Sequence, residues 1–198
     1  MELTVIIISY NVRDYLKQCL SSVIIASENI DCEVFVVDNN SSDDSCVMVE
    51  NEFPQVILIK NKINNGFSSA NNQAIKISKG RYILLLNPDT LVNSDTFAQG
   101  IRFMNDHPDA GAMGVKMING EGVYLPESKR AIPTPLTAFF KTFGFSCLFP
   151  KSALFNRYYL VNIKDYETSE TEIISGAFML ICRKALIRAG LLDEDYFM

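Results

Sequence analysis

The 198-residue sequence has no tryptophan and only one histidine, His107, which stands directly before a proline. Zinc sites are built from several histidine and cysteine ligands at short spacings. The five cysteines are scattered and form no C-x-x-C pair. Zinc chemistry and a disulfide framework are therefore not indicated, and the cysteine pattern suits a reducing compartment, for which we expect the cytoplasm.

Two common nucleotide-binding signatures are also missing. No G-x-G-x-x-G follows the first apolar run and no G-x-x-x-x-G-K-[ST] occurs, which argues against a Rossmann-type dinucleotide site and against P-loop hydrolysis. The net charge is −5 and the sequence contains no basic stripe. We therefore expect no nucleic-acid partner.

Long uncharged runs are absent too. No stretch of about 18 residues lacks charge, so no transmembrane helix is predicted, and the N-terminus lacks the pattern of a signal peptide. The most apolar late region, residues 135–155, is interrupted by Lys141 and Lys151. We expect a core-packing helix and loop there; the alternative is peripheral contact with a membrane surface or a lipid-linked substrate.

Short apolar runs rich in β-branched residues indicate buried strands, and the stretches between them are long enough for helices. Strands are predicted at residues 3–8, 32–37, 56–60, 82–86, 110–118 and 175–182. Helices are predicted at residues 14–26, from a cap at 41–44 to about 53, at 68–78 (ended by Lys79-Gly80), at 94–105 and at 183–189, with a hairpin turn at Asn119-Gly120. This alternation predicts an α/β fold, a mostly parallel central sheet flanked by helices, in one domain of residues 1–198.

A polar cluster follows three of these strands. The clusters are Ser9-Tyr10-Asn11, Asp38-Asn39-Asn40 and Asn87-Pro88-Asp89. Open parallel sheets bind their ligands outside the carboxyl ends of the strands. The clusters therefore outline one candidate active site.

Asp38 is expected to project from its strand into this crevice, because a charged side chain inside a sheet is costly unless it is paired. There it would accept a hydrogen bond from a ligand. The alternative role is a helix cap or turn residue, which we expect of Asp43 and Asp44.

Asp89 is a candidate metal ligand. Pro88 fixes the backbone before it, and one carboxylate suffices for a hard divalent ion when substrate phosphates supply further oxygens. The alternative is a cap for the following helix, for which Asn93 or Ser94 is better placed. A weaker signal is the loop from Asn64 to Phe67, whose N–H groups could cradle a phosphate at a helix start.

Five segments, in this order, resemble glycosyltransferase family 2 of the GT-A fold, especially its rhamnosyltransferase-like branch. They are TVIIISYN (residues 4–11), VVDNNSSD (36–43), NNGFSSANN (64–72), LLLNPD (84–89) and ISGAFML (174–180). The resemblance implies inverting transfer of a sugar from a nucleotide-diphosphate donor to a saccharide or lipid-linked acceptor. It further implies a role in cell-surface polysaccharide synthesis, in the cytoplasm or at the inner face of the membrane.

The resemblance also assigns roles to residues. Tyr10 would lie against the nucleotide base, Asp38 would accept its ring N–H, and Asn72 would help hold the sugar donor, with Gly66 allowing close approach. Asp89 would bind Mg²⁺ or Mn²⁺ between the two phosphates. Asn87 stands where the family often has the first acid of Asp-x-Asp, a variant typical of the rhamnosyltransferase-like branch. Ser9, Asn11, Asn64 and Asn87 complete the expected donor-binding set.

In the family, the segment matching residues 191–198 is followed by a Glu-Asp pair that carries the catalytic base, and the sequence stops at Met198. Asp193, Glu194 and Asp195 match the residues before that pair, so we leave the catalytic base unassigned. We expect residues 1–120 to form the donor-binding half and residues 121–198 an incomplete acceptor-side half.

Two alternatives remain open at this point. One is a non-catalytic module that binds nucleotide sugars. The other, less favoured, is a sugar nucleotidylyltransferase, which would need a glycine-rich and basic loop after the first strand, where this sequence has Ser9-Tyr10-Asn11-Val12-Arg13.

Overall fold

The computed structural model describes residues 1–125, 128–130, 142, 168–171 and 173–197. The chain divides into two compact units. The first consists of Met1–Met113 and Gly176–Met198, and the second of Gly114–Ser175. All the predicted site residues belong to the first unit.

A six-stranded sheet in the order β3-β2-β1-β4-β8-β5 forms the centre of the first unit. Strands β1 (Leu3–Ser9), β2 (Cys32–Asp38), β3 (Ile57–Lys60) and β4 (Tyr82–Leu86) are parallel. Strand β8 (Phe178–Cys182) runs antiparallel to both β4 and the short β5 (Ala112–Met113), between which it lies. The predicted mostly parallel sheet is confirmed.

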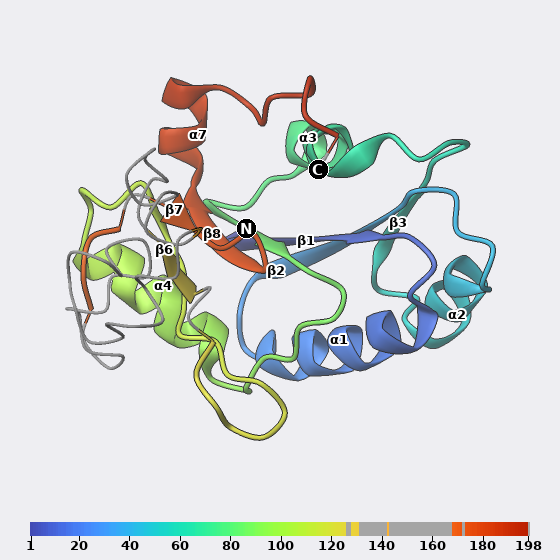
Figure 1. Ribbon diagram of the computed structural model, residues 1–198, viewed down its shortest axis with the longest axis horizontal. Coiled ribbons are helices and arrows are strands. Elements are labelled where there is room, and N and C mark those ends of the chain that lie inside the picture. Colours follow the sequence, from blue (N-terminus) through green and yellow to red (C-terminus); the bar gives the residue numbers. More distant parts are fainter. Residues whose placement is uncertain (126–127, 131–141, 143–167, 172, 198) are drawn as a thin grey trace. The chain divides into compact units, whose positions relative to one another are not determined.

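Helices cover both faces of this sheet. They are α1 (Arg13–Ala26), α2 (Ser45–Glu52), α3 (Gly66–Ile77), α4 (Thr96–Asp106) and α7 (Arg183–Ala189). Figure 1 shows α3 and α7 on one face, and α1, α2 and α4 on the other. This three-layer arrangement is the α/β architecture that the alternating sequence pattern predicts.

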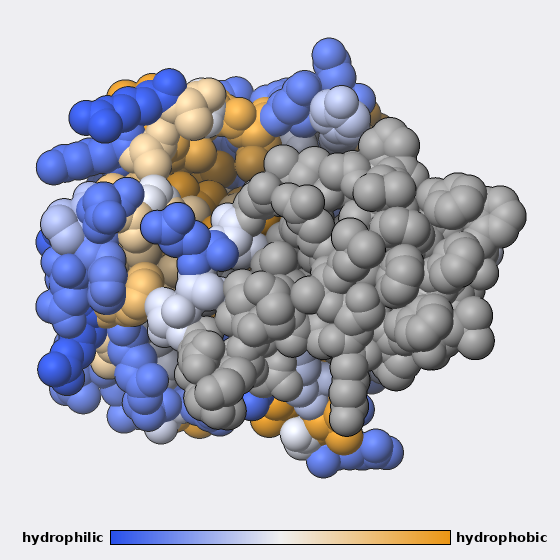
Figure 2. Space-filling model, turned by 60° about the vertical axis from the view of Figure 1, so that its left-hand side comes forward, coloured by the Kyte–Doolittle hydropathy of each residue, from blue (hydrophilic) through white to orange (hydrophobic). Residues whose placement is uncertain are grey.

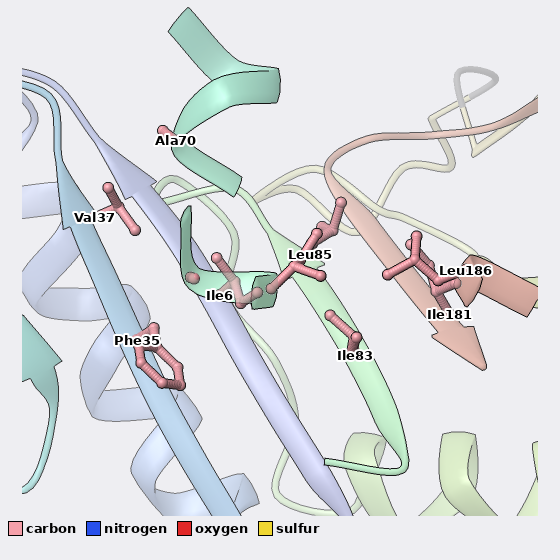
Figure 3. Packing of buried hydrophobic residues seen from close by; sticks show 10 residues of the cluster. Ile6, Phe35, Val37, Ala70, Ile83, Leu85, Ile181 and Leu186 are labelled. Carbon is pink, nitrogen blue, oxygen red and sulfur yellow. The ribbon is translucent and has the colours of Figure 1, made fainter. Parts of the chain in front are cut away.

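The central strands are buried on both faces, which explains their continuous apolar sequences. One set of side chains, including Ile6, Phe35 and Leu85, packs with Ala70 of α3 and Leu186 of α7 (Figure 3). The alternate residues of the same strands are also buried, on the face that α1 and α4 cover. Packing on both faces therefore fixes the direction of every strand residue up to the carboxyl ends.

The end of α3 differs from the prediction. A glycine after a helix commonly takes a left-handed conformation, but α3 ends at Ile77 with Ser78 extended, and Gly80 has no positive φ. A Cβ at Gly80 would instead overlap the backbone N of Thr4, and the Gly80 N–H donates to Thr4 Oγ1 at 2.9 Å. Gly80 is required because the loop crosses directly over β1.

The region predicted as one strand at residues 110–118 is only partly extended. Residues 112–113 form β5, and Ile118 makes an isolated antiparallel bridge to Tyr124 in the second unit. The turn between them is organised by Asn119, whose N–H donates to Val123 O at 2.8 Å, with the left-handed position at Gly122 in place of Gly120. The second unit also contains the antiparallel pair β6 (Lys129–Arg130) and β7 (Ile173–Ile174).

Charged and polar side chains cover most of the described surface on the face shown in Figure 2, and apolar side chains reach it in smaller areas. Within the described ranges, no helix combines the length and apolar character needed to cross a bilayer. Apart from residue 142, the apolar region at 135–155 lies outside the described residues, so both the predicted core-packing helix and loop and the alternative of membrane contact stay untested.

Candidate active site

The carboxyl ends of β1, β2 and β4 lie at one edge of the sheet. In the parallel register Ser9 is opposite Asp38, and Ile7 is opposite Leu86, the last residue of β4. Asn87 and Asp89 follow directly. The topology therefore brings the three polar clusters to neighbouring strand ends, at the place where open α/β sheets bind ligands.

Asp38 is 2% exposed, so the expectation of a side chain open to the crevice is wrong. The loop after β2 folds back over it, and the Ser41 N–H donates to Asp38 Oδ2 at 2.8 Å. Asp38 Oδ1 is buried and has no hydrogen-bond partner in the described part of the chain, and the same is true of Ser9 Oγ. A buried oxygen without a donor is costly, so this pair of atoms is suited to a ligand that supplies hydrogen-bonding groups.

Cys46, in the first turn of α2, lies near Asp38. Burial first, and then the negative charge of Asp38, raise the pKa of the Cys46 thiol to about 11. At neutral pH the thiol is protonated and is only a weak hydrogen-bond donor. Asp38 therefore keeps its capacity to accept a stronger hydrogen bond.

Tyr10 and Asn11 occupy the loop after β1. The Tyr10 side chain is half exposed, as a residue that stacks on a ligand ring must be. Asn11 is in the left-handed region (φ 54°), its N–H donates to Ser41 Oγ at 2.9 Å, and its Oδ1 accepts the Ser42 N–H at 2.8 Å. Asn11 thus joins the loops after β1 and β2, and its predicted contact with a sugar donor stays a prediction.

Asp43 fastens the starts of two helices. Its carboxylate accepts the Arg13 N–H at 2.8 Å, and also the N–H and hydroxyl of Ser45 at 3.2 and 2.5 Å. Partial burial raises the pKa of Asp43, but the hydrogen bonds from Ser45 and Arg13 outweigh it, so the pKa lies below the usual value. The predicted structural role of Asp43 is confirmed, and Asp44 is a turn residue with φ 61°.

Asp89 is exposed and makes no hydrogen bond or ion pair with any described residue. It does not cap α4, which begins at Thr96 and has no side-chain cap. Burial first, and then the charge of Asp89, raise the pKa of the Cys19 thiol to about 12. The Asp89 carboxylate is therefore unengaged by the described residues, close to the start of the loop after β4.

The residues present fit a divalent ion held by one protein carboxylate. In the described part of the chain, no three His, Cys, Asp or Glu residues are grouped closely enough to hold a metal by themselves. An ion at Asp89 would need further oxygens from a ligand such as a diphosphate, which is the usual arrangement for Mg²⁺.

The loop from Asn64 to Phe67 is already occupied by contacts within the chain. The Gly66 N–H donates to Asn64 Oδ1 at 2.9 Å, and the Phe67 N–H donates to Phe197 O at 2.8 Å. Gly66 has φ 76°, and a Cβ there would overlap Phe197 O. The glycine does permit a close approach, but the approaching group is residue 197 of the chain itself.

Asn72 is likewise engaged. Its side chain is buried and bonds to Leu192 and Glu194, so its predicted contact with the sugar donor stays a prediction. Asn39, for which the sequence predicts no separate role, is buried and donates to Gly66 O at 3.2 Å while accepting from Asn61 at 2.9 Å. Its place beside Asp38 was the only signal that it belongs to the site.

Comparison with known proteins shows the family to which the chain belongs. A sequence profile described as "Glycosyl transferase family 2" matches residues 4–189. The Bacillus subtilis minor teichoic acid biosynthesis protein GgaB is 37% identical over 112 residues, which are 54% of this chain and 12% of GgaB. The Escherichia coli UDP-Glc:alpha-D-GlcNAc-diphosphoundecaprenol beta-1,3-glucosyltransferase WfaP is 34% identical over 107 residues, 52% of this chain and 42% of WfaP. The chain thus spans well under two thirds of these relatives.

Two solved structures show the same fold. The mannosyltransferase PcManGT of Pyrobaculum calidifontis, in complex with GDP-Man and Mn²⁺, has a TM-score of 0.69 at 21% identity, covering 98% of this chain and 48% of PcManGT. Staphylococcus aureus TarS 1–349, in complex with UDP-GlcNAc, has a TM-score of 0.52 at 25% identity, covering 69% of this chain and 38% of the TarS chain. The expected fold is confirmed by both.

Proposed function

Because this chain belongs to glycosyl transferase family 2, we propose that it transfers a sugar from a nucleotide-diphosphate donor to a saccharide or lipid-linked acceptor. We propose that the transfer serves cell-surface polysaccharide synthesis, in the cytoplasm or at the inner face of the membrane. This proposal is supported by two relatives: GgaB, which is named for minor teichoic acid biosynthesis, and WfaP, whose name specifies a substrate that carries diphosphoundecaprenol.

The observation that carries the proposal is the pair of buried oxygens at the ends of β1 and β2. Asp38 Oδ1 and Ser9 Oγ have no described partner, and the two residues are paired in the strand register. In the proposed complex Asp38 accepts the ring N–H of the nucleotide base, Ser9 bonds a neighbouring polar group, and Tyr10 lies against the ring. A carboxylate that accepts an N–H binds more strongly than a neutral acceptor.

Asp89 is proposed to hold Mg²⁺ or Mn²⁺ together with the two phosphates. When bound, the ion would offset the charge that develops on the leaving nucleotide. Asn87 lies at the same strand end and leaves Asp89 as the only carboxylate in its motif, which supports the rhamnosyltransferase-like branch. We further propose that the anomeric configuration is inverted, as the family resemblance implies.

Calorimetric titration of the chain with UDP, GDP and dTDP, in the presence of Mn²⁺, tests the nucleotide site. Asp38→Asn removes the negative charge while keeping the size of the side chain. We expect it to weaken binding of the preferred nucleotide by about 1.5–3 kcal/mol, the usual value of a charge-assisted hydrogen bond.

The matched control is Asp44→Asn, which changes an exposed turn residue of the same loop. It should leave the affinity unchanged. Equal affinities for Asp38→Asn and the unaltered chain would remove Asp38 from the nucleotide site, and failure to bind any of the three nucleotides would overturn the proposed function.

A further inference from the structure

A short C-terminal segment, residues 192–197, lies along α3 in the same compact unit (Figure 1). One buried side chain, Asn72, holds it in three ways. Asn72 Nδ2 donates to Leu192 O and to Glu194 Oε1, both at 2.8 Å, and Asn72 Oδ1 accepts the Leu192 N–H at 3.1 Å. The amide is thus bonded to this segment through both its nitrogen and its oxygen.

Glu194 has a second contact on the same helix. Lys76, one turn after Asn72 and therefore on the same helix face, lies 3.8 Å from Glu194 Oε1. The hydrogen bond from Asn72 and the charge of Lys76 lower the pKa of Glu194, against a smaller opposing effect of desolvation. Glu194 is therefore ionised and fixed at neutral pH.

The other end of the segment is anchored at the start of α3. Phe197 O accepts the Phe67 N–H at 2.8 Å, and the missing side chain of Gly66 makes room for it. Gly66 O in turn accepts a hydrogen bond from Asn39, the residue after Asp38. The segment therefore runs from Asn72 back to the edge of the sheet where the nucleotide site is proposed.

We propose that Asn72 is a positioning residue, which acts on the reaction by fixing the acidic C-terminal segment beside the site and makes no contact with the sugar donor. The effect on the reaction rests on the proposed function. The hydrogen bonds by which Asn72 holds residues 192–197, which we call the latch, do not rest on it. Between the two anchors, Asp193 and Asp195 are exposed, and the Asp195 N–H donates to Asp193 Oδ1 at 3.0 Å. The latch thus holds a preformed turn of acidic residues, on what we propose is the acceptor side.

Hydrogen exchange tests the latch without any substrate. Asn72→Ala removes all three hydrogen bonds, so the amides of Leu192 and Phe67 should exchange at least about 10-fold faster, as expected for local opening of a segment. Asn51→Ala, at an exposed asparagine of α2, is the control and should change neither amide. Unchanged exchange at Leu192 in Asn72→Ala would overturn the latch.

A swap of donor and acceptor separates the latch from a general loss of structure. Asn72→Asp places a second carboxylate beside Glu194 and should open the segment. Adding Glu194→Gln lets the glutamine amide donate to the new aspartate, which should restore part of the protection of residues 192–197. Absence of any recovery in the double variant would show that Asn72 does not act through Glu194.

Nucleotide binding and turnover then decide what the latch is for. In Asn72→Ala the dissociation constant for the preferred nucleotide diphosphate should stay within about 2-fold, whereas kcat for sugar transfer by the protein should fall by about 10- to 100-fold through lost positioning. A large rise of the dissociation constant would show that Asn72 contacts the sugar donor directly. An unchanged kcat would show that Asn72 has no positioning role. If the unaltered chain binds no nucleotide, the proposed function fails, while the exchange experiment still decides the latch.

Discussion

At the scale of single residues, the carboxylates of the site differ in how the chain engages them. Asp38 is buried with one oxygen bonded to Ser41, Asp43 is fully engaged at two helix starts, and Asp89 has no described partner. Only a carboxylate without internal hydrogen bonds is available to a metal ion at no cost to the fold. The three acids therefore have separate roles despite similar places after strands.

Asp89 supports a prediction about metal dependence. If the ion is shared between Asp89 and a diphosphate, Mn²⁺ should tighten nucleotide diphosphate binding. Asp89→Asn should abolish most of that enhancement, on the order of 10-fold for one lost charged ligand, and leave metal-free affinity nearly intact. Titrations with and without Mn²⁺ measure both. Asp109→Asn, at an exposed acid elsewhere, is the control, and full enhancement in Asp89→Asn would exclude Asp89 as a ligand.

The positions of these residues at the strand ends could be predicted from the sequence, whereas their burial and side-chain contacts could not. Asp38 was found because it follows an apolar run, but its burial depends on how the next four residues fold back, which no local pattern reports. Asn72 was assigned to the sugar donor, while its partners in the structure, Leu192 and Glu194, are remote in sequence. Pairings between distant residues are set by tertiary packing and not by the residues' own neighbours.

At the scale of elements, the starts of α1 and α2 depend on one shared side chain. Both helices lack a side-chain hydrogen bond from their own N-cap residue, and Asp43 bonds the Arg13 N–H of α1 and the Ser45 N–H of α2. The two loops that frame the nucleotide site are therefore held together by a structural acid.

This arrangement predicts a pH-dependent contribution to stability. The pKa of Asp43 is lowered in the folded chain, so its stabilisation is present above the unfolded pKa of about 3.9 and is lost as the pH falls through the lower folded value. Asp43→Asn keeps one acceptor oxygen but replaces the other by an NH₂ group, so it should cost about 1 kcal/mol of unfolding free energy at pH 7, the usual value of one lost hydrogen bond, and almost nothing near pH 2.

Urea unfolding of Asp43→Asn and of the unaltered chain across this pH range provides the measurement. Asp44→Asn is the control, because Asp44 is exposed and makes no cap hydrogen bond. A cost for Asp43→Asn that does not change with pH would show that the hydrogen bonds do not depend on the carboxylate's charge.

Most elements of the first unit could be predicted from apolar runs and their spacing, and β4 and α7 were predicted with the observed bounds. The apolar runs do not indicate which strands pair with one another. The place of β8 between β4 and β5, and its antiparallel direction, are set by contacts between segments far apart in the chain. For the same reason β5 was predicted too long, since only two of its residues find a partner strand.

At the scale of the whole molecule, β8 joins the C-terminal part of the chain to the core of the first unit. Leu180 is buried, pairs with Leu84, and lies against Gly100 of α4. Leu180→Ala should lower the unfolding free energy by about 2–5 kcal/mol, the range for a buried leucine. The same loss of stability should be seen in the helical signal by circular dichroism and in faster hydrogen exchange of the β1 amides.

The control for this prediction is Ile187→Ala on α7, where the side chain is 76% exposed. It should cost less than about 0.5 kcal/mol. If Leu180→Ala instead affected β8 and α7 while leaving β1 at full protection, the C-terminal part would be an independent unit and not a member of the central sheet.

The position of β8 also determines the order in which this fold can form on the ribosome. The edge of β4 that β8 covers is synthesised well before residues 178–182. Until then, a row of unpaired backbone groups on β4 stays open, and exposed strand edges are sites of unwanted association. A nascent chain that stalls before residue 178 would therefore need a chaperone, whereas a chain that includes β8 protects that edge by itself.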